Sequence, residues 1–232
     1  MLTIYRKLLS WPFLSRPSLS GLLLSLSLAL LGGCVQQATV TPQDTEDGLL
    51  PRQTGLDSVS AAYAFDLSGA KVYLEPVNVA YSRRFPGAGS PLRAKDYELD
   101  QKDIARLQDL MGQTLTERFL APRQSVLVSD KAQADYVLQL DLSSFSLGAP
   151  LDPQPWLWRV YTDQSAYGVL SGELQDSNGN AVMRFSDRRD IGENFGSLGP
   201  NGRFERFTSV TFWTDMKTDM RRAFASLDKS LQ

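Results

Sequence analysis

The segment AYGVLSGELQDSNGNAVMRF, residues 166–185, predicts two strands joined by a turn. Its first half places small and apolar residues at every second position, a period that predicts a β-strand with one buried face. Its second half repeats that period, and the DSNGN sequence between the halves predicts a hairpin turn because Asn and Gly accept the backbone angles of tight turns. The residues expected to face the core are Ala166, Gly168, Leu170, Gly172, Leu174, Ala181, Met183 and Phe185.

Four charged residues, DRRD at 187–190, follow the second strand. Asp187 continues the inward parity of Phe185, so one interpretation is a buried carboxylate with a shifted pKa. The other interpretation is that the strand ends before Asp187 and that water surrounds the charges. We favour the second, because Asp and Arg are mostly exposed in proteins.

Upstream of the hairpin we expect three strands, at residues 70–77, 125–129 and from 136 to about 147. The apolar residues of the third strand change parity, and a bulge near Ser143 and Ser144 would keep Leu142 and Phe145 on the same face. Residues 78–98 contain two Pro and two Gly, which predicts a loop.

Two helices complete the pattern. Asp100 is a candidate N-cap for the first helix, which should end near Pro122 and has one apolar face: Ile104, Leu107, Met111, Leu115 and Phe119. The second helix is expected at about 209–230, with an apolar face from Trp213 to Leu231 and these charged residues outside: Asp215, Lys217, Asp219, Arg221 and Arg222. The order β-α-β-β-β-β-α predicts an α+β two-layer sandwich, a mixed sheet of about five strands with two amphipathic helices on one face.

The N-terminus has the features of an export signal. Arg6, Lys7 and Arg16 precede the apolar run LSGLLLSLSLALL at 19–31, and residues 1–33 contain no acid. The run is shorter than the roughly 20 apolar residues of a membrane-spanning helix. It leads into Leu31-Gly32-Gly33-Cys34, which resembles the lipobox of bacterial lipoproteins.

That resemblance implies cleavage between Gly33 and Cys34 and attachment of a diacylglycerol to the Cys34 thiol, followed by an acyl chain on the new amino terminus. Two or three acyl chains would hold the protein on a membrane without a spanning helix. The alternative is an uncleaved anchor helix in which Cys34 is an incidental thiol. By the same resemblance, the absence of Asp after Cys34 favours the outer membrane, with the domain facing the periplasm, over retention in the inner membrane.

These features divide the chain into a signal peptide at 1–33, a flexible tether at 34–62 and a single α+β domain at 63–232. The tether is expected because this segment is polar and lacks a sustained period. Removal of the signal peptide takes three of the 24 basic residues and leaves 21 against 26 acidic residues, a formal charge of −5. Nucleic acid is therefore not an expected partner.

Composition excludes several kinds of catalysis. The chain has no His, which removes Ser-His-Asp and Cys-His catalysis and His-ligated metal sites. Its single Cys cannot form an internal disulfide or a two-cysteine site. The SLDK sequence at 226–229 matches the SxxK string of serine acylating enzymes, but it ends a helix and lacks the companion strings. We therefore expect no metal or cofactor and assign no catalytic residue.

Two segments carry candidate binding residues. Arg83, Arg84 and Arg93 lie in a basic stretch without acid at 82–95 that could bind an anionic headgroup, cell-wall carboxylates or an acidic partner; a hydrated loop is the alternative. The second segment holds Trp156, Trp158 and Tyr161, which could stack on sugar rings or anchor an interface. Its alternative is that these aromatic side chains cover the open end of the core.

From Lys71 to Leu231 the chain resembles a family of bacterial lipoproteins known as domain of unknown function 3313. The resemblance rests on these stretches: VYLEPV at 72–77, ADYVL at 134–138, ELQDSNGNAV at 173–182, DRR at 187–189, and Trp213 leading into Phe224. It implies a periplasm-facing lipoprotein and supplies no activity or catalytic residue.

The function expected from these observations is a non-catalytic binding or accessory module of the cell envelope. It would bind an envelope protein or a cell-wall component through the loops at 148–165 and 190–207. One alternative is a carboxylate- or serine-dependent hydrolase of cell wall or lipid, because 26 acids always supply candidate pairs. Another is a structural subunit of an envelope or transport complex.

Overall fold

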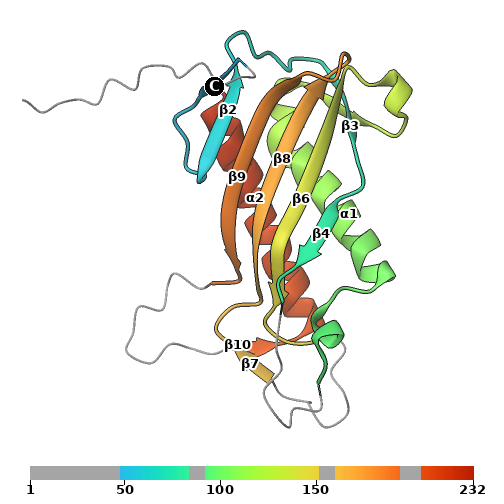
Figure 1. Cartoon of the computed structure of the whole chain (residues 1–232), viewed down its shortest axis with the longest axis vertical. Helices are drawn as coiled ribbons and strands as arrows, with labels where there is room; N and C mark the ends of the chain where they lie inside the picture. Colours follow the sequence, from blue (N-terminus) through green and yellow to red (C-terminus); the bar gives the residue numbers. More distant parts are fainter. Residues whose placement is uncertain (1–47, 84–91, 152–159, 194–204) are drawn as a thin grey trace, which may run out of the picture. The chain divides into compact units, whose positions relative to one another are not determined.

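The computed structural model describes residues 48–83, 92–151, 160–193 and 205–232. Over these ranges the α+β class with a mixed sheet and two main helices is confirmed (Figure 1). The sheet is larger than expected: it contains eight strands in place of about five, and a separate ribbon of two strands adds to it. The main path runs β1-β2-β9-β8-β6-β3-β5, and β4 also pairs with β6.

The predicted hairpin forms the centre of the sheet. β8 (Ala166–Asp176) and β9 (Ala181–Ile191) are antiparallel, and Gly172 lies opposite Phe185. In the turn the Asp176 carboxylate accepts hydrogen bonds from the backbone N–H groups of Asn178 and Asn180. Gly179 has a φ of 82°, a conformation that favours Gly. The turn residues therefore fix the register of the two longest paired strands.

β6 (Tyr136–Leu147) lies beside β8 and contains the expected bulge. The register shifts between Ser143 and Ser146, and Ser144 has a φ of 50°. Leu142, Phe145 and Leu147 are consequently all fully buried despite their change of parity. An extra residue in one strand of an antiparallel pair turns the following side chains to the other face.

On the far side of β6 the strands are parallel. β3 (Lys71–Leu74) pairs with both β6 and β5 (Val126–Val128). The expected loop at 78–98 is wrong at both of its ends, because β4 (Asn78–Tyr81) pairs with β6 and a 3₁₀ turn, η1, spans Ala94–Tyr97. With only four residues in β4, the alternation of polar and apolar residues is too short to identify a strand.

The expected tether at 34–62 is wrong from Leu49 onward. β1 (Leu49–Pro51) pairs with β2 (Ser58–Ala62), and β2 pairs with β9, so both strands belong to the main sheet. Leu49, Val59 and Ala61 are buried. Three- and five-residue strands separated by polar residues lack the sustained period that sequence analysis requires.

Both main helices lie on the same face of the sheet, behind the strands in Figure 1. α1 (Gln101–Leu115) begins as predicted, with the Asp100 carboxylate accepting from the Asp103 N–H. It continues through a π turn, η2 (Thr116–Leu120), and a 3₁₀ turn, η3 (Ala121–Arg123); a further 3₁₀ turn, η4, spans Lys131–Gln133. α2 (Ser209–Ser230) has the predicted bounds and its N-cap at Thr208. None of the helices in the described ranges is long and apolar enough to cross a membrane.

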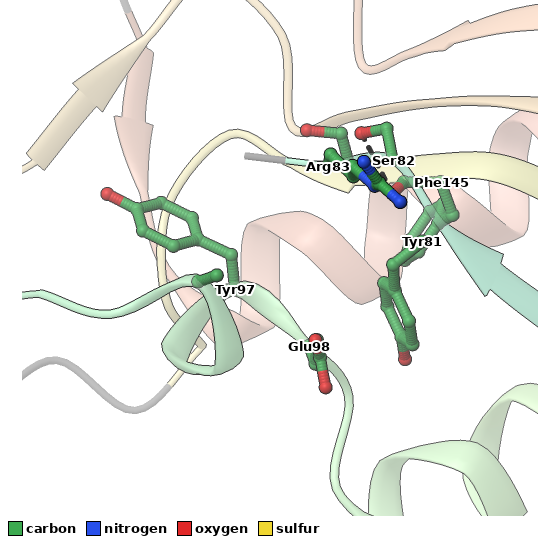
Figure 2. A pocket seen from close by; sticks show the side chains of 8 residues that line it. Tyr81, Ser82, Arg83, Tyr97, Glu98 and Phe145 are labelled. Carbon is green, nitrogen blue, oxygen red and sulfur yellow. Dashed lines mark hydrogen bonds between the residues drawn. The ribbon is translucent and has the colours of Figure 1, made fainter. Parts of the chain in front are cut away.

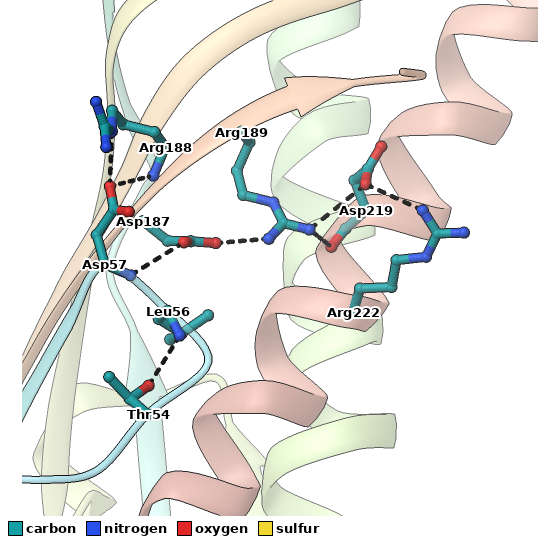
Figure 3. Close-up of polar contacts among 8 residues, drawn as sticks. All are labelled: Thr54, Leu56, Asp57, Asp187, Arg188, Arg189, Asp219 and Arg222. Carbon is teal, nitrogen blue, oxygen red and sulfur yellow. Dashed lines mark hydrogen bonds and ion pairs between the residues drawn. The ribbon is translucent and has the colours of Figure 1, made fainter. Parts of the chain in front are cut away.

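The favoured interpretation of the DRRD sequence is wrong. β9 continues to Ile191, and Asp187 is buried on the inner face of the sheet. Asp219 of α2, expected outside, is also buried. Arg189 lies between these two carboxylates (Figure 3), 2.6 Å from Asp187 and 3.4 Å from Asp219, and so compensates both charges.

Candidate functional site

The strand register distinguishes two ends of the sheet. Leu147, Ala166 and Ile191 are aligned at one end, which we call the loop end. Tyr136, Asp176 and the hairpin turn lie at the other, the hairpin end. β1 joins the sheet toward the hairpin end, since Leu49 is paired with Ala62 next to the β2 residue that faces Met183.

The structure brings the two predicted binding loops together at the loop end. β7 (Val160–Thr162), from the 148–165 loop, forms an antiparallel ribbon with β10 (Glu205–Phe207), from the 190–207 loop. Tyr161 is 55% exposed in this ribbon, so it does not cover the core. Trp156 and Trp158 lie outside the described residues.

A cavity of about 440 Å³ lies at the same end, and we call it the Tyr81 pocket (Figure 2). It is assembled from the end of β4, the η1 turn and the bulged end of β6. Its lining residues are Tyr81, Ser82, Arg83, Ala94, Tyr97, Glu98, Phe145 and Ser146. A volume in this range is typical of small-molecule sites.

Tyr81 is the last residue of β4, and it connects this strand to the segment that follows η1. Its ring packs against Phe145 with a centroid separation of 5.9 Å, and its hydroxyl oxygen accepts a hydrogen bond of 2.9 Å from the Leu99 N–H. Burial raises the pKa of Tyr81, an effect that the Leu99 N–H opposes and that the charges of Glu98 and Asp103 reinforce. The phenol is therefore neutral near pH 7.

Two opposite charges line the pocket. Arg83 follows β4 and Glu98 follows η1, and both side chains are exposed. Within the described ranges neither side chain takes part in a hydrogen bond or an ion pair. In the view of Figure 2, Glu98 lies between the rings of Tyr97 and Tyr81. The site can therefore offer a guanidinium, a carboxylate, aromatic surface and hydroxyl groups.

The other predicted basic residues do not line this cavity. Arg93 precedes η1, its side chain is 71% exposed, and it is paired with Asp96 at 3.8 Å. Arg84 lies outside the described residues, as do the expected lipidation and cleavage positions, Gly33 and Cys34. In the parts of the chain that the structure describes, no group of three or more Cys, Asp or Glu residues could hold a metal ion.

Sequence analysis missed the roles of Tyr81, Tyr97 and Glu98. They lie in the segment that was expected to be a loop, and they line the same cavity as Phe145 because β4 pairs with β6 at the bulge. The sequence feature that pointed to this cavity was the basic stretch at 82–95, and of the predicted basic residues that the structure describes there, only Arg83 lines the cavity.

No protein-family model and no curated protein sequence matches this chain. Solved structures with a similar arrangement include the PelC dodecamer from Paraburkholderia phytofirmans, 15% identical, with 72% of this chain and 96% of that chain covered and a TM-score of 0.37. Protein XCC0632 from Xanthomonas campestris, of family DUF330, is 10% identical, with 76% and 90% covered and a TM-score of 0.34. A homolog of neuraminyllactose-binding hemagglutinin from Helicobacter pylori is 11% identical, with 72% and 83% covered and a TM-score of 0.34. These values describe a distant likeness in fold alone.

Proposed function

We propose that this chain is a bacterial lipoprotein, anchored in the outer membrane by acyl chains at Cys34, whose periplasmic domain is a non-catalytic binding module of the cell envelope. The anchor is supported by the Leu31-Gly32-Gly33-Cys34 sequence and by the absence of any other Cys in the chain. Two or three acyl chains bind a bilayer firmly, whereas one chain alone binds it reversibly.

The binding role is supported by the position of the candidate binding features at the loop end. The β7–β10 ribbon and the Tyr81 pocket both lie there, whereas the chain enters the sheet near the hairpin end. The 11 residues of β8 span about 35 Å between these ends. A partner could therefore approach the loop end without contacting the point where the tethered segment joins the domain.

Site-specific photocrosslinking in intact cells tests this role. A photoreactive residue at Tyr161, exposed at the loop end, should give a discrete crosslinked adduct with an envelope component. The same residue at Asn178, exposed in the hairpin turn, is the matched control and should give none. Adducts from Asn178 alone, or no adduct from Tyr161, would contradict binding at the loop end.

One observation favours the second candidate, a structural subunit of an envelope complex. β5 is an edge strand of the main path, and Val126 and Leu127 are 52% and 37% exposed there. Exposed apolar edge strands can pair with another chain. Light scattering of the protein purified in detergent tests this candidate: oligomers that Val126→Lys converts to monomers would support it, and a monomer at all concentrations would exclude self-assembly.

A further inference from the structure

The Tyr81 pocket contains an unusual pair of side chains, one acidic and one basic, that do not neutralise each other. Arg83 and Glu98 line the same 440 Å³ cavity, and no described residue is paired with either of them. The neighbouring Arg93, which precedes η1, and Asp96, within η1, do form a pair. The two lining charges are thus available to a ligand.

The groups around these charges favour a ligand with an ammonium group near Glu98. A carboxylate beside tyrosine rings attracts a cation in two ways, by charge and by the negative faces of the rings. The guanidinium of Arg83 matches the geometry of a carboxylate, which it can bind through two parallel hydrogen bonds. Ser82 and Ser146 add hydroxyl groups to the lining, and the hydroxyl of Ser82 is already directed to the Phe145 carbonyl at 3.4 Å.

We infer that the Tyr81 pocket binds the zwitterion of an amino acid or of a short peptide with both termini free, with its carboxylate on Arg83 and its ammonium on Glu98. This inference rests on the proposed function and names the chemical class of the ligand. A peptide that belongs to the cell wall is the source that fits a periplasm-facing domain.

Two other classes of ligand fit the lining less well. A neutral sugar would use the aromatic rings and hydroxyl groups but would leave both charges without partners. A purely anionic ligand could bind Arg83, but the carboxylate of Glu98, which lines the same cavity, would repel it. A zwitterionic lipid headgroup shares the required chemistry, and the experiment separates it from a peptide.

The test is calorimetric titration of the full-length protein, purified in detergent, with dialanine and two blocked forms of it. N-acetylation removes the ammonium and C-terminal amidation removes the carboxylate. Dialanine should bind about tenfold more tightly than either blocked form, the difference expected for one charge-assisted contact. Equal affinities for all three peptides, or no heat of binding with dialanine, would overturn the inference.

Two variants assign the contacts. Arg83→Gln should abolish the preference for dialanine over its amide, and Glu98→Gln should abolish the preference over the acetylated form. Arg93→Gln is the matched control, because Arg93 is exposed and does not line the cavity, and it should leave all three affinities unchanged. If Arg93→Gln also abolished the preference for dialanine, the effect would come from the change in net charge, and the assignment of the contacts to Arg83 and Glu98 would be wrong.

Glycerophosphoethanolamine is the lipid-headgroup probe. Binding weaker than that of dialanine supports the peptide, and tighter binding overturns it in favour of a lipid headgroup. Failure of the peptide titration leaves the acylation of Cys34 and the crosslink from Tyr161 unaffected. The ligand class and the proposed function therefore fail independently.

Discussion

At the scale of single residues, Arg189 has the clearest structural role. It donates to Asp187 and Asp219, which are both buried between β9 and α2, and it also contacts the Asp219 carbonyl at 3.3 Å (Figure 3). Each carboxylate has a further backbone donor: the Asp57 N–H for Asp187 and the Gly192 N–H for Asp219. A buried carboxylate is tolerated when its charge is paired and its oxygens are hydrogen-bonded.

Substituting Arg189 therefore removes the ion pair of the buried Asp187 and one of the two ion pairs of the buried Asp219, which keeps Arg222 at 3.6 Å. Arg189→Met should lower the free energy of unfolding by about 3–5 kcal/mol, measured by urea denaturation. Arg188→Met is the matched control: Arg188 is the preceding residue, its side chain is 69% exposed, and solvent screens its pair with Asp57, so the expected loss is much smaller. Similar losses for both variants would show that Arg189 has no special role.

Tyr81 gives a second prediction at this scale. Because burial raises its pKa, its phenol should ionise above pH 10.0, and Glu98→Gln should move the ionisation down by removing a nearby negative charge. The pKa of Tyr81 is higher in the folded protein than in the unfolded chain. The contribution of the protonated phenol to the free energy of unfolding is therefore fully present below pH 10.0 and is lost as the pH rises through the folded-state pKa. The ultraviolet difference between the protein and its Tyr81→Phe variant measures the ionisation. Ionisation of Tyr81 at or below pH 10.0 would contradict the buried environment.

At the scale of elements, the packing of β8 on β9 depends on Gly172, whose missing side chain leaves room for the ring of Phe185. A Cβ at Gly172 would overlap the Phe185 ring and lie 3.0 Å from Leu140. Gly172→Ala should therefore destabilise the protein by about 1–3 kcal/mol in urea denaturation. Phe185→Leu in the same chain should recover part of that loss by removing the ring.

The control for this prediction is Gly55→Ala. Its Cβ would meet only the Ser226 side chain at 3.9 Å, so the expected change lies within about 0.5 kcal/mol. Equal effects at the two glycines would mean that contact with Phe185 does not determine the cost.

The elements that could be predicted from the sequence are the long ones. β8, β9 and β6 span 11 or 12 residues and α2 spans 22, so their patterns exceed chance and identify each element, although the strand β9 was expected to end before Asp187 and continues to Ile191. β1, β2 and β4 have three to five residues and are stabilised by pairing with strands far away in the sequence, which no local pattern records.

The candidate site shows the same limit. Arg83 was identified by the charge of its segment, but its cavity also requires Glu98 and Ser146, which only the tertiary fold brings together. The parity of Asp187 was visible in the sequence, whereas its compensation by Arg189 and the burial of Asp219 depend on how α2 packs on β9.

At the scale of the whole molecule, the proposed function requires an anchor at Cys34 and a binding surface at the loop end. The domain from Leu49 to Gln232 has its proposed contacts at the loop end, and its first strand joins the sheet toward the hairpin end. A lipoprotein arranged in this way acts by position, because acyl chains confine it to a surface while its binding residues stay accessible.

Intact-mass spectrometry of the protein purified from membranes tests whether Cys34 is acylated. The expected chain begins at Cys34 and carries a diacylglycerol on its sulfur and an acyl chain on its amino group, whereas Cys34→Ser should retain residues 1–33 and lack both modifications. A mature protein with an unmodified Cys34 thiol, or one that keeps residues 1–33, would show that the proposed lipid anchor is wrong.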